Sequence, residues 1–445
     1  MHISGATGVR WQGRGGLAAG TALGAALALS AVGCSGDGAQ TADATVAIAP
    51  SDGNGKVRPD SPISVRVANG KLHNVTVSTR GTTRRQGNKV EGARTVDGAG
   101  WRSRWTLDPD MGYQVTATAL GRDGMTRTVS SSFRTARVKK PIAASAIAPY
   151  DGETVGVGMP IMLHFDRKVR NRAQVERALE VRSSKPVEGA WYWYTNQDVI
   201  FRTKKYWPRR SKVRVIAHLS GVRAAKGVYG ARNLDLRFKV GDKHISVASE
   251  NRHRMVVEKN GKKVRTMPIS MGRGGTWKYI TTNGTHLAMD KAYLTIMDSS
   301  TTGCPPGCPG YYRQDVYWTI RISDSGEFVH SAPWSVGSQG NANVSHGCVN
   351  ARPGDAVWFY RFTRRGDIIK VTGTRRELEY DNGWGYWQKP WRKWVKGSAF
   401  KRSIVTAHLD GSVAQLTRSA PRARPTQPGT PSPARPGPGP RAAHN

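Results

Sequence analysis

Acidic residues are scarce in this chain of 445 residues, in which 31 Asp and Glu stand against 68 Lys and Arg and give a formal net charge of +37. Such an excess predicts attraction to an anionic polymer or an anionic membrane surface, and it says nothing about the fold. Nucleic acid is one such polymer, but the sequence contains no zinc-finger spacing, no helix-turn-helix signal and no RNP-like motif. We therefore expect no nucleic-acid partner.

Cysteine is also rare, with four residues in the whole chain: Cys34, Cys304, Cys308 and Cys348. None of them lies between residues 46 and 241, so no internal disulfide can stabilise that stretch. The cysteines and histidines follow no standard zinc-ligand spacing, which argues against a structural metal site. We expect neither a metal nor a cofactor in this protein.

The apolar run near the N-terminus is too short to span a membrane. It covers residues 17–32, and a spanning helix needs roughly 18 or more apolar residues. Arg10 and Arg14 precede the run, which predicts a secretory signal peptide over residues 1–33. The run closes on Ala31-Val32-Gly33-Cys34, which resembles a bacterial lipobox, in which the cysteine is diacylated. Plain secretion with an incidental cysteine is the alternative.

Two similar segments about 100 residues apart predict a duplicated domain. Residues 48–53 read Ile-Ala-Pro-Ser-Asp-Gly, and residues 147–152 read Ile-Ala-Pro-Tyr-Asp-Gly. Each is followed by short runs with period-2 alternation between turn residues, which indicates an antiparallel sandwich. After a linker at 34–45, we expect immunoglobulin-like domains at 46–138 and 139–241.

A third unit is expected at residues 242–375. Alternating runs flank Asn260-Gly261, which is a strong hairpin signal. Pro353 opens a helix expected to end at Phe362. A Trp-rich packing subdomain at 376–400 follows. Residues 401–445 are expected to form a disordered Pro/Arg-rich tail, since no acidic residue follows Asp410. The predicted fold class is therefore mainly β.

The segment from Ser345 to Asn350, Ser-His-Gly-Cys-Val-Asn, carries the candidate nucleophile, Cys348. A reactive thiol needs a base or a positive field nearby. A glycine directly before it allows close approach of a ligand to the backbone. Two histidines are candidate bases: His346, two residues away, and His330, 18 residues upstream. Sequence spacing does not choose between them. A metal site or a buried core cysteine is the competing interpretation.

His330, followed after 15 residues by this hexapeptide, resembles the signature of the L,D-transpeptidase catalytic domain, the YkuD family. Residues 296–300, 312–316 and 328–337 resemble mycobacterial-type members, as does the Trp-rich segment. Those members also carry two immunoglobulin-like domains ahead of the catalytic domain. The resemblance covers about residues 45–396.

The resemblance implies that Cys348 attacks the peptide bond before D-Ala in a tetrapeptide stem of peptidoglycan and forms a thioester. A diamino-acid amine of a second stem then completes a 3→3 cross-link. His330 would be the general base and acid, oriented by the backbone carbonyl of Ser331. The residues implied to form the oxyanion hole, contact the substrate or shape the pocket are Tyr312, His346, Gly347, Asn350, Ser345, Met297 and Ser331.

The predicted signal peptide and the lipobox-like segment ending at Cys34 lead us to expect a protein that is lipid-anchored on the extracytoplasmic face of the membrane and faces the wall. The basic excess then suits anionic wall polymers or the membrane surface, and we expect a monomer. Water or a protein amine as acyl acceptor, giving a carboxypeptidase or a protein-anchoring enzyme, is the alternative, as is a non-catalytic wall-binding lipoprotein.

Cys304 and Cys308 depart from the family pattern. They fall in the loop that resembles the active-site lid, where familiar members need no cysteine. Oxidising conditions outside the cytoplasm favour disulfides. We therefore expect a disulfide that closes this small loop.

Overall fold

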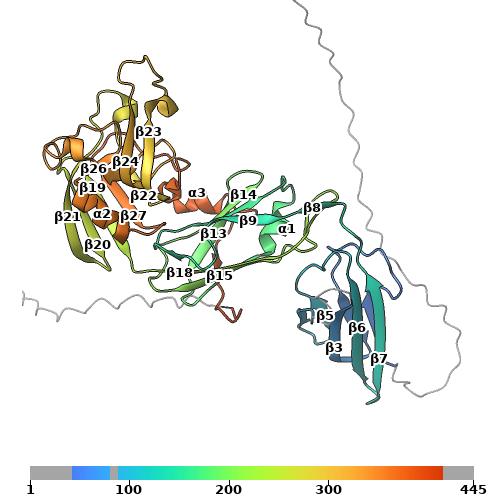
Figure 1. Cartoon of the computed structure of the whole chain (residues 1–445). Coiled ribbons are helices and arrows are strands. Elements are labelled where there is room, and N and C mark those ends of the chain that lie inside the picture. Colours follow the sequence, from blue (N-terminus) through green and yellow to red (C-terminus); the bar gives the residue numbers. More distant parts are fainter. Residues whose placement is uncertain (1–42, 81–88, 414–445) are drawn as a thin grey trace, which may run out of the picture. The chain divides into compact units, whose positions relative to one another are not determined.

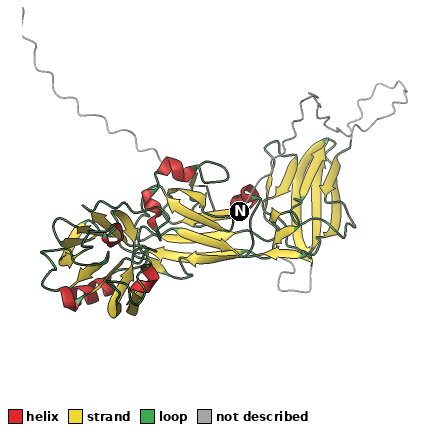
Figure 2. Cartoon of the chain, turned by 90° about the horizontal axis from the view of Figure 1, so that it is seen from above, coloured by secondary structure: helices red, strands yellow, loops and turns green. Residues whose placement is uncertain are grey.

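The computed structural model describes residues 43–80 and 89–413, and strands dominate it (Figures 1 and 2). The predicted signal peptide, the predicted lipidation site Cys34 and residues 414–445 lie outside the described residues. No helix within the described ranges is both long and apolar enough to cross a membrane. The predicted mainly β fold class is confirmed.

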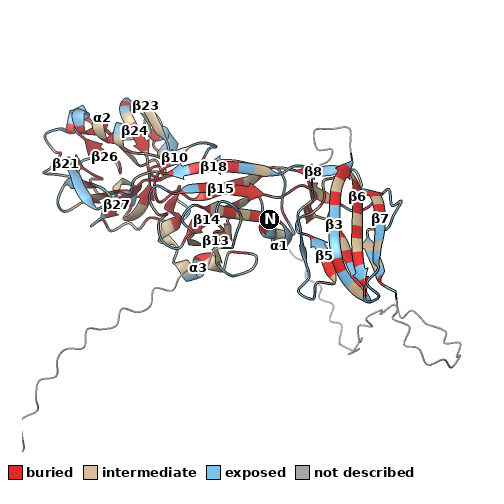
Figure 3. Ribbon diagram, turned by 90° about the horizontal axis from the view of Figure 1, so that it is seen from below, coloured by how far each residue is buried: buried red, intermediate tan, exposed pale blue. Residues whose placement is uncertain are grey.

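The first sandwich consists of two antiparallel sheets. One sheet has the order β1 (Thr45–Ala49), β2 (Ser64–Ala68), β5 (Gly100–Ser103) and β4 (Gly92–Arg94). The other has the order β3 (Gly70–Arg80), β6 (Gly112–Gly121) and β7 (Thr126–Arg134). The period-2 pattern of β6 is visible as alternating burial (Figure 3). Tyr113, Val115, Ala117 and Ala119 face the core, because successive side chains of a strand point to opposite faces.

The second sandwich repeats this plan around a larger core. One sheet has the order β10 (Thr154–Val155), β18 (Leu234–Val240), β15 (Lys212–Ala217) and β12 (Leu179–Ser183). The other has the order β28 (Ile404–Val405), β13 (Glu188–Trp193), β14 (Asp198–Thr203), β11 (Ile161–Phe165) and β9 (Ala144–Ala148). A third, small sheet contains β16 (Arg223–Ala225), β17 (Val228–Gly230) and β8 (Lys140–Ile142). The short helix α1 (Arg172–Arg177) precedes β12.

The third unit is built on one nine-stranded sheet. Its strands are, in sheet order, β22 (Gly284–Leu287), β27 (Ile368–Thr372), β19 (His244–Ser249), β20 (Arg254–Lys259), β21 (Lys262–Ser270), β26 (Val349–Ala351), β25 (Phe328–Ser331), β24 (Arg313–Arg321) and β23 (Lys291–Asp298). The predicted hairpin is confirmed as β20 and β21, and the predicted helix as α2 (Pro353–Phe362). Single 3-10 turns are η1 (Trp277–Tyr279), η2 (Ser299–Thr302) and η3 (Pro333–Ser335).

The Trp-rich segment packs on the second sandwich. It contains η4 (Gly385–Gln388) and α3 (Trp391–Val395). Trp394 is fully buried, stacks on Tyr192 at 4.6 Å between ring centroids, and donates its indole N–H to the Ala190 carbonyl at 3.0 Å. Arg202 lies nearby with its guanidinium over three tryptophan rings, at 4.8 to 5.3 Å from their centroids. Burial lowers the pKa of Arg202 to about 10.

The prediction that disorder begins at residue 401 is wrong for residues 401–413. Strand β28 pairs antiparallel with β13, and the Thr406 N–H donates to the Val187 carbonyl at 2.9 Å. Thr406 is completely buried. A polar, short segment of this kind carries little strand signal of its own, and pairing with a sheet edge supplies its order.

We predict that Trp394→Ala destabilises the folded chain by about 3–5 kcal/mol, because the substitution removes a fully buried indole and leaves a cavity. Trp277→Ala is the matched control, since that side chain is 59% exposed. Thermal unfolding of both variants checks this. Equal melting temperatures for the two variants would show that the Trp-rich segment contributes little to stability.

Candidate active site

Cys348 ends a tight turn that leads directly into β26. Ser345 Oγ donates to the Cys348 carbonyl at 2.6 Å and accepts from the Gly347 N–H at 3.1 Å. Gly347 has a φ of +130°, a conformation that favours glycine. Thr281 Oγ1 donates to the Gly347 carbonyl at 2.8 Å. The turn is therefore held by Ser345 from within and by Thr281 from outside.

Parallel pairing of β25 with β26 sets His330 beside the nucleophile. His330 lies opposite Asn350 in the register. Cys348 precedes Asn350 by two residues, so its side chain is expected on the same face of the sheet as those of His330 and Asn350. The His330 Nδ1–H donates to the Ser331 carbonyl at 2.9 Å. That hydrogen bond places the proton on Nδ1 and leaves Nε2 as the proton acceptor.

His346, the other candidate base, is held between two aromatic rings. Its ring stacks on Tyr312 at 5.2 Å and meets Tyr279 edge-on at 4.6 Å. Burial, together with the positive charges of Arg273 and Lys278, lowers the pKa of His346. We therefore keep His330 as the candidate base and treat His346 as part of the pocket wall.

The resting thiol and imidazole are both uncharged at neutral pH. Burial raises the pKa of Cys348 to about 12, the negative charge of Glu327 adds to this, and the Phe328 backbone opposes it. Burial lowers the pKa of His330 to about 4, although the hydrogen bond to the Ser331 carbonyl acts in the opposite direction and raises it. Cys348 Sγ lies 3.6 Å from the Gly326 carbonyl, to which the thiol donates. Cys348 is therefore protonated at neutral pH in the free protein.

A cavity of about 1110 Å³ gathers most of the residues expected from the sequence. Those that line it are Cys348, His330, Tyr312, His346, Asn350, Ser345, Met297 and Cys304. Ser331 and Gly347 do not line it; Ser331 holds His330 through its carbonyl, and Gly347 shapes the turn. The Gly347 N–H donates to Ser345 Oγ at 3.1 Å, and a role for this N–H in binding an oxyanion stays a prediction.

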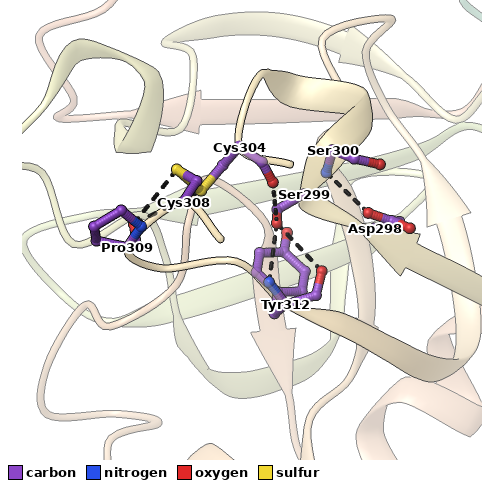
Figure 4. The surroundings of a disulfide bond; sticks show 7 residues. All are labelled: Asp298, Ser299, Ser300, Cys304, Cys308, Pro309 and Tyr312. Atoms are coloured by element: carbon purple, nitrogen blue, oxygen red, sulfur yellow. Dashed lines mark hydrogen bonds between the residues drawn. A yellow bond between two sulfur atoms is a disulfide. The ribbon is translucent and has the colours of Figure 1, made fainter. Parts of the chain in front are cut away.

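Cys304 and Cys308 form a disulfide in the loop between η2 and β24 (Figure 4). Ser299 Oγ lies 3.0 Å from the Cys304 carbonyl and 3.2 Å from the Tyr312 carbonyl, and it accepts from the Tyr312 N–H at 2.9 Å. Ser299 thus joins the disulfide loop to the backbone of Tyr312, whose side chain lines the cavity. Burial is the main cause of the raised pKa of Tyr312, so its hydroxyl stays a hydrogen-bond donor.

Sequence reasoning missed two residues beside the nucleophile. Trp334 lines the cavity and stacks on His330 at 5.9 Å, and its place four residues after His330 was the available signal. Glu327 is a buried carboxylate that accepts from the Thr282 N–H and hydroxyl, each at 2.6 Å. Nothing in the local sequence marks Glu327, because its partners lie 45 residues away.

Over residues 43–80 and 89–413, no three His, Cys, Asp or Glu side chains gather closely enough to hold a metal ion.

Comparison with known proteins identifies the class. The family model described as the L,D-transpeptidase catalytic domain, YkuD, matches residues 242–371. The model described as a bacterial Ig domain matches residues 54–223, a span that includes parts of both sandwiches.

Individual relatives point the same way. The chain is 39% identical to L,D-transpeptidase 2 of Mycobacterium tuberculosis over 78% of this chain and 83% of the relative. It is 34% identical to L,D-transpeptidase 5 of that species over 79% of this chain and 76% of the relative. An L,D-transpeptidase solved in complex with imipenem is 36% identical, with 52% of this chain and 99% of that chain covered and a TM-score of 0.45. The chain belongs to the L,D-transpeptidase family.

We predict that the free enzyme reacts slowly with iodoacetamide at pH 7 and that the rate rises about tenfold per pH unit up to pH 10. The thiolate is the nucleophile, and a pKa near 12 keeps its fraction small and proportional to hydroxide over this range. Mass spectrometry of the alkylated peptide, with Cys348→Ala as the blank, checks this. A plateau at or below pH 8 would show a thiolate stabilised in the resting enzyme.

Proposed function

We propose that the protein cross-links peptidoglycan by L,D-transpeptidation and makes 3→3 links through a thioester on Cys348. The observation that carries this proposal is that the Cys348 thiol and the His330 imidazole, whose Nδ1–H donates to the Ser331 carbonyl, line the same cavity. Membership of the L,D-transpeptidase family supports the reaction class.

The donor half-reaction begins with an uncharged thiol. As Sγ attacks the carbonyl before D-Ala, its proton passes to His330 Nε2. The tetrahedral oxyanion accepts hydrogen bonds from backbone N–H groups of the turn, for which we propose His346 and Cys348, with the Tyr312 hydroxyl nearby. Collapse breaks the C–N bond, His330 returns the proton to the departing amine, and D-Ala leaves with the thioester formed.

The acceptor half-reaction reverses these roles. The neutral side-chain amine of a second stem attacks the thioester, and His330 Nε2 takes its proton. Collapse expels the sulfur, which recovers that proton as a thiol, so one amide has formed and the enzyme is unchanged. The Ser331 carbonyl stabilises the imidazolium in both halves, the role that a carboxylate fills in a Ser-His-Asp triad.

We further propose that the chain works outside the cytoplasm, lipid-anchored at Cys34. The basic excess of +37 supports attraction to anionic wall polymers or to the membrane surface.

We predict that wild-type protein converts tetrapeptide-bearing muropeptides into 3→3 dimers with release of D-Ala, that Cys348→Ala forms none, and that His330→Gln loses at least a hundredfold in rate. A positioned general base contributes typically about 10²–10⁴-fold. Chromatography with mass sequencing of the products is the measurement. Release of D-Ala without dimers would indicate water as the acceptor, and dimers from Cys348→Ala would overturn the mechanism.

A further inference from the structure

Two cations of the active-site cavity have no acidic partner. Arg273 and Lys278 line the cavity and are exposed at its rim. Neither forms an ion pair with a carboxylate of the described residues. Each instead lies over the ring of Tyr279, with Arg273 Cζ at 4.5 Å and Lys278 Nζ at 5.2 Å from the centroid.

Several other charges of the cavity are already engaged. Arg321 donates to the Ser323 and Asp324 carbonyls. Asp298 pairs with Arg313 at 3.2 Å, and Glu327 is held by Thr282. Asp324 also lines the cavity, and its carboxylate forms no ion pair with Arg273 or Lys278. Arg273 and Lys278 are therefore cations of this cavity whose charge no neighbouring acid neutralises.

The backbone of this pair is tied to the nucleophile turn. The Arg273 N–H donates to the Ser345 carbonyl at 2.9 Å, three residues before Cys348. The Lys278 carbonyl lies 3.8 Å from the position that a side chain on Gly347 would take. Tyr279, on which both cations rest, meets His346 edge-on. The pair therefore borders the turn that carries Cys348 and lines the same cavity.

We propose that Arg273 and Lys278 form a carboxylate-binding subsite that reads a carboxylate of the peptide donor. This deepens the proposed function and rests on it. An arginine fork binds a carboxylate with two parallel hydrogen bonds, and a lysine adds a mobile point charge. Tyr279 restricts both side chains, which lowers the entropy that binding would otherwise cost.

Two kinds of carboxylate in the donor suit this chemistry. One is the C-terminal carboxylate of the departing D-Ala, and its recognition would select donors in which D-Ala is the last residue. The other is a carboxylate further back in the stem. The test uses three donors: the free tetrapeptide, its C-terminal D-alaninamide, and a tetrapeptide whose other carboxyl groups are carboxamides.

The experiment compares kcat/KM of full-length protein for these donors, with D-Ala or D-alaninamide release as the readout. The test variant is R273Q/K278Q. The control variant is R252Q/K262Q, which loses the same charge at exposed positions that do not line the cavity. Melting temperatures of both variants confirm that they fold.

Wild type and the control should prefer one carboxylate donor over its amide by about ten- to a hundredfold, as hydrogen bonds to charged groups allow. R273Q/K278Q should lose this preference while keeping its rate on that amide within about threefold. Which amide is disfavoured by wild type identifies the carboxylate that is read.

Three results would overturn the subsite: no preference in wild type, an unchanged preference in R273Q/K278Q, or an equal loss in the control. A wild-type protein that releases nothing from any donor would instead contradict the proposed function. The two failures are therefore distinguishable.

Discussion

The parallel pairing of two short strands is the constraint on which the rest of the site depends. β25 and β26 have four and three residues, and they place His330 opposite Asn350. Parallel strands need a long connection between them, and here it contains η3 and the turn that ends at Cys348. The candidate base is consequently held by a strand of the sheet, and the thiol is held by the hydrogen-bonded turn that leads into the neighbouring strand.

Burial gives this pair its resting state. Desolvation disfavours the charged form of each partner, so it raises the pKa of Cys348 and lowers that of His330. The carboxylate of Glu327 acts in the same direction on the thiol. A stable thiolate–imidazolium pair is thus disfavoured at rest, and in the proposed mechanism proton transfer is part of the attack on a bound carbonyl. Such a thiol is also protected from oxidants between turnovers.

Local signals predicted much of this architecture. Asn260-Gly261 fixed the β20–β21 hairpin, and Pro353 marked the first residue of α2. The choice between His330 and His346 depends on which strands pair, a non-local property that spacing does not encode. Glu327 and strand β28 were not predicted for the same reason, since both depend on contacts with residues far away in the sequence. β28 has two residues and is ordered by its pairing with β13. The resemblance to a family, not local pattern, supplied the role of His330.

The central claim is that Cys348 is the acylated nucleophile, and intact-mass spectrometry with a carbapenem tests it most directly. Imipenem is a suitable probe because its strained β-lactam carbonyl acylates an activated nucleophilic thiol. The account predicts a mass increase of one imipenem equivalent, located on the peptide that contains Cys348 and absent from Cys348→Ala. No adduct on the wild-type protein, or an adduct that persists in Cys348→Ala, would contradict it.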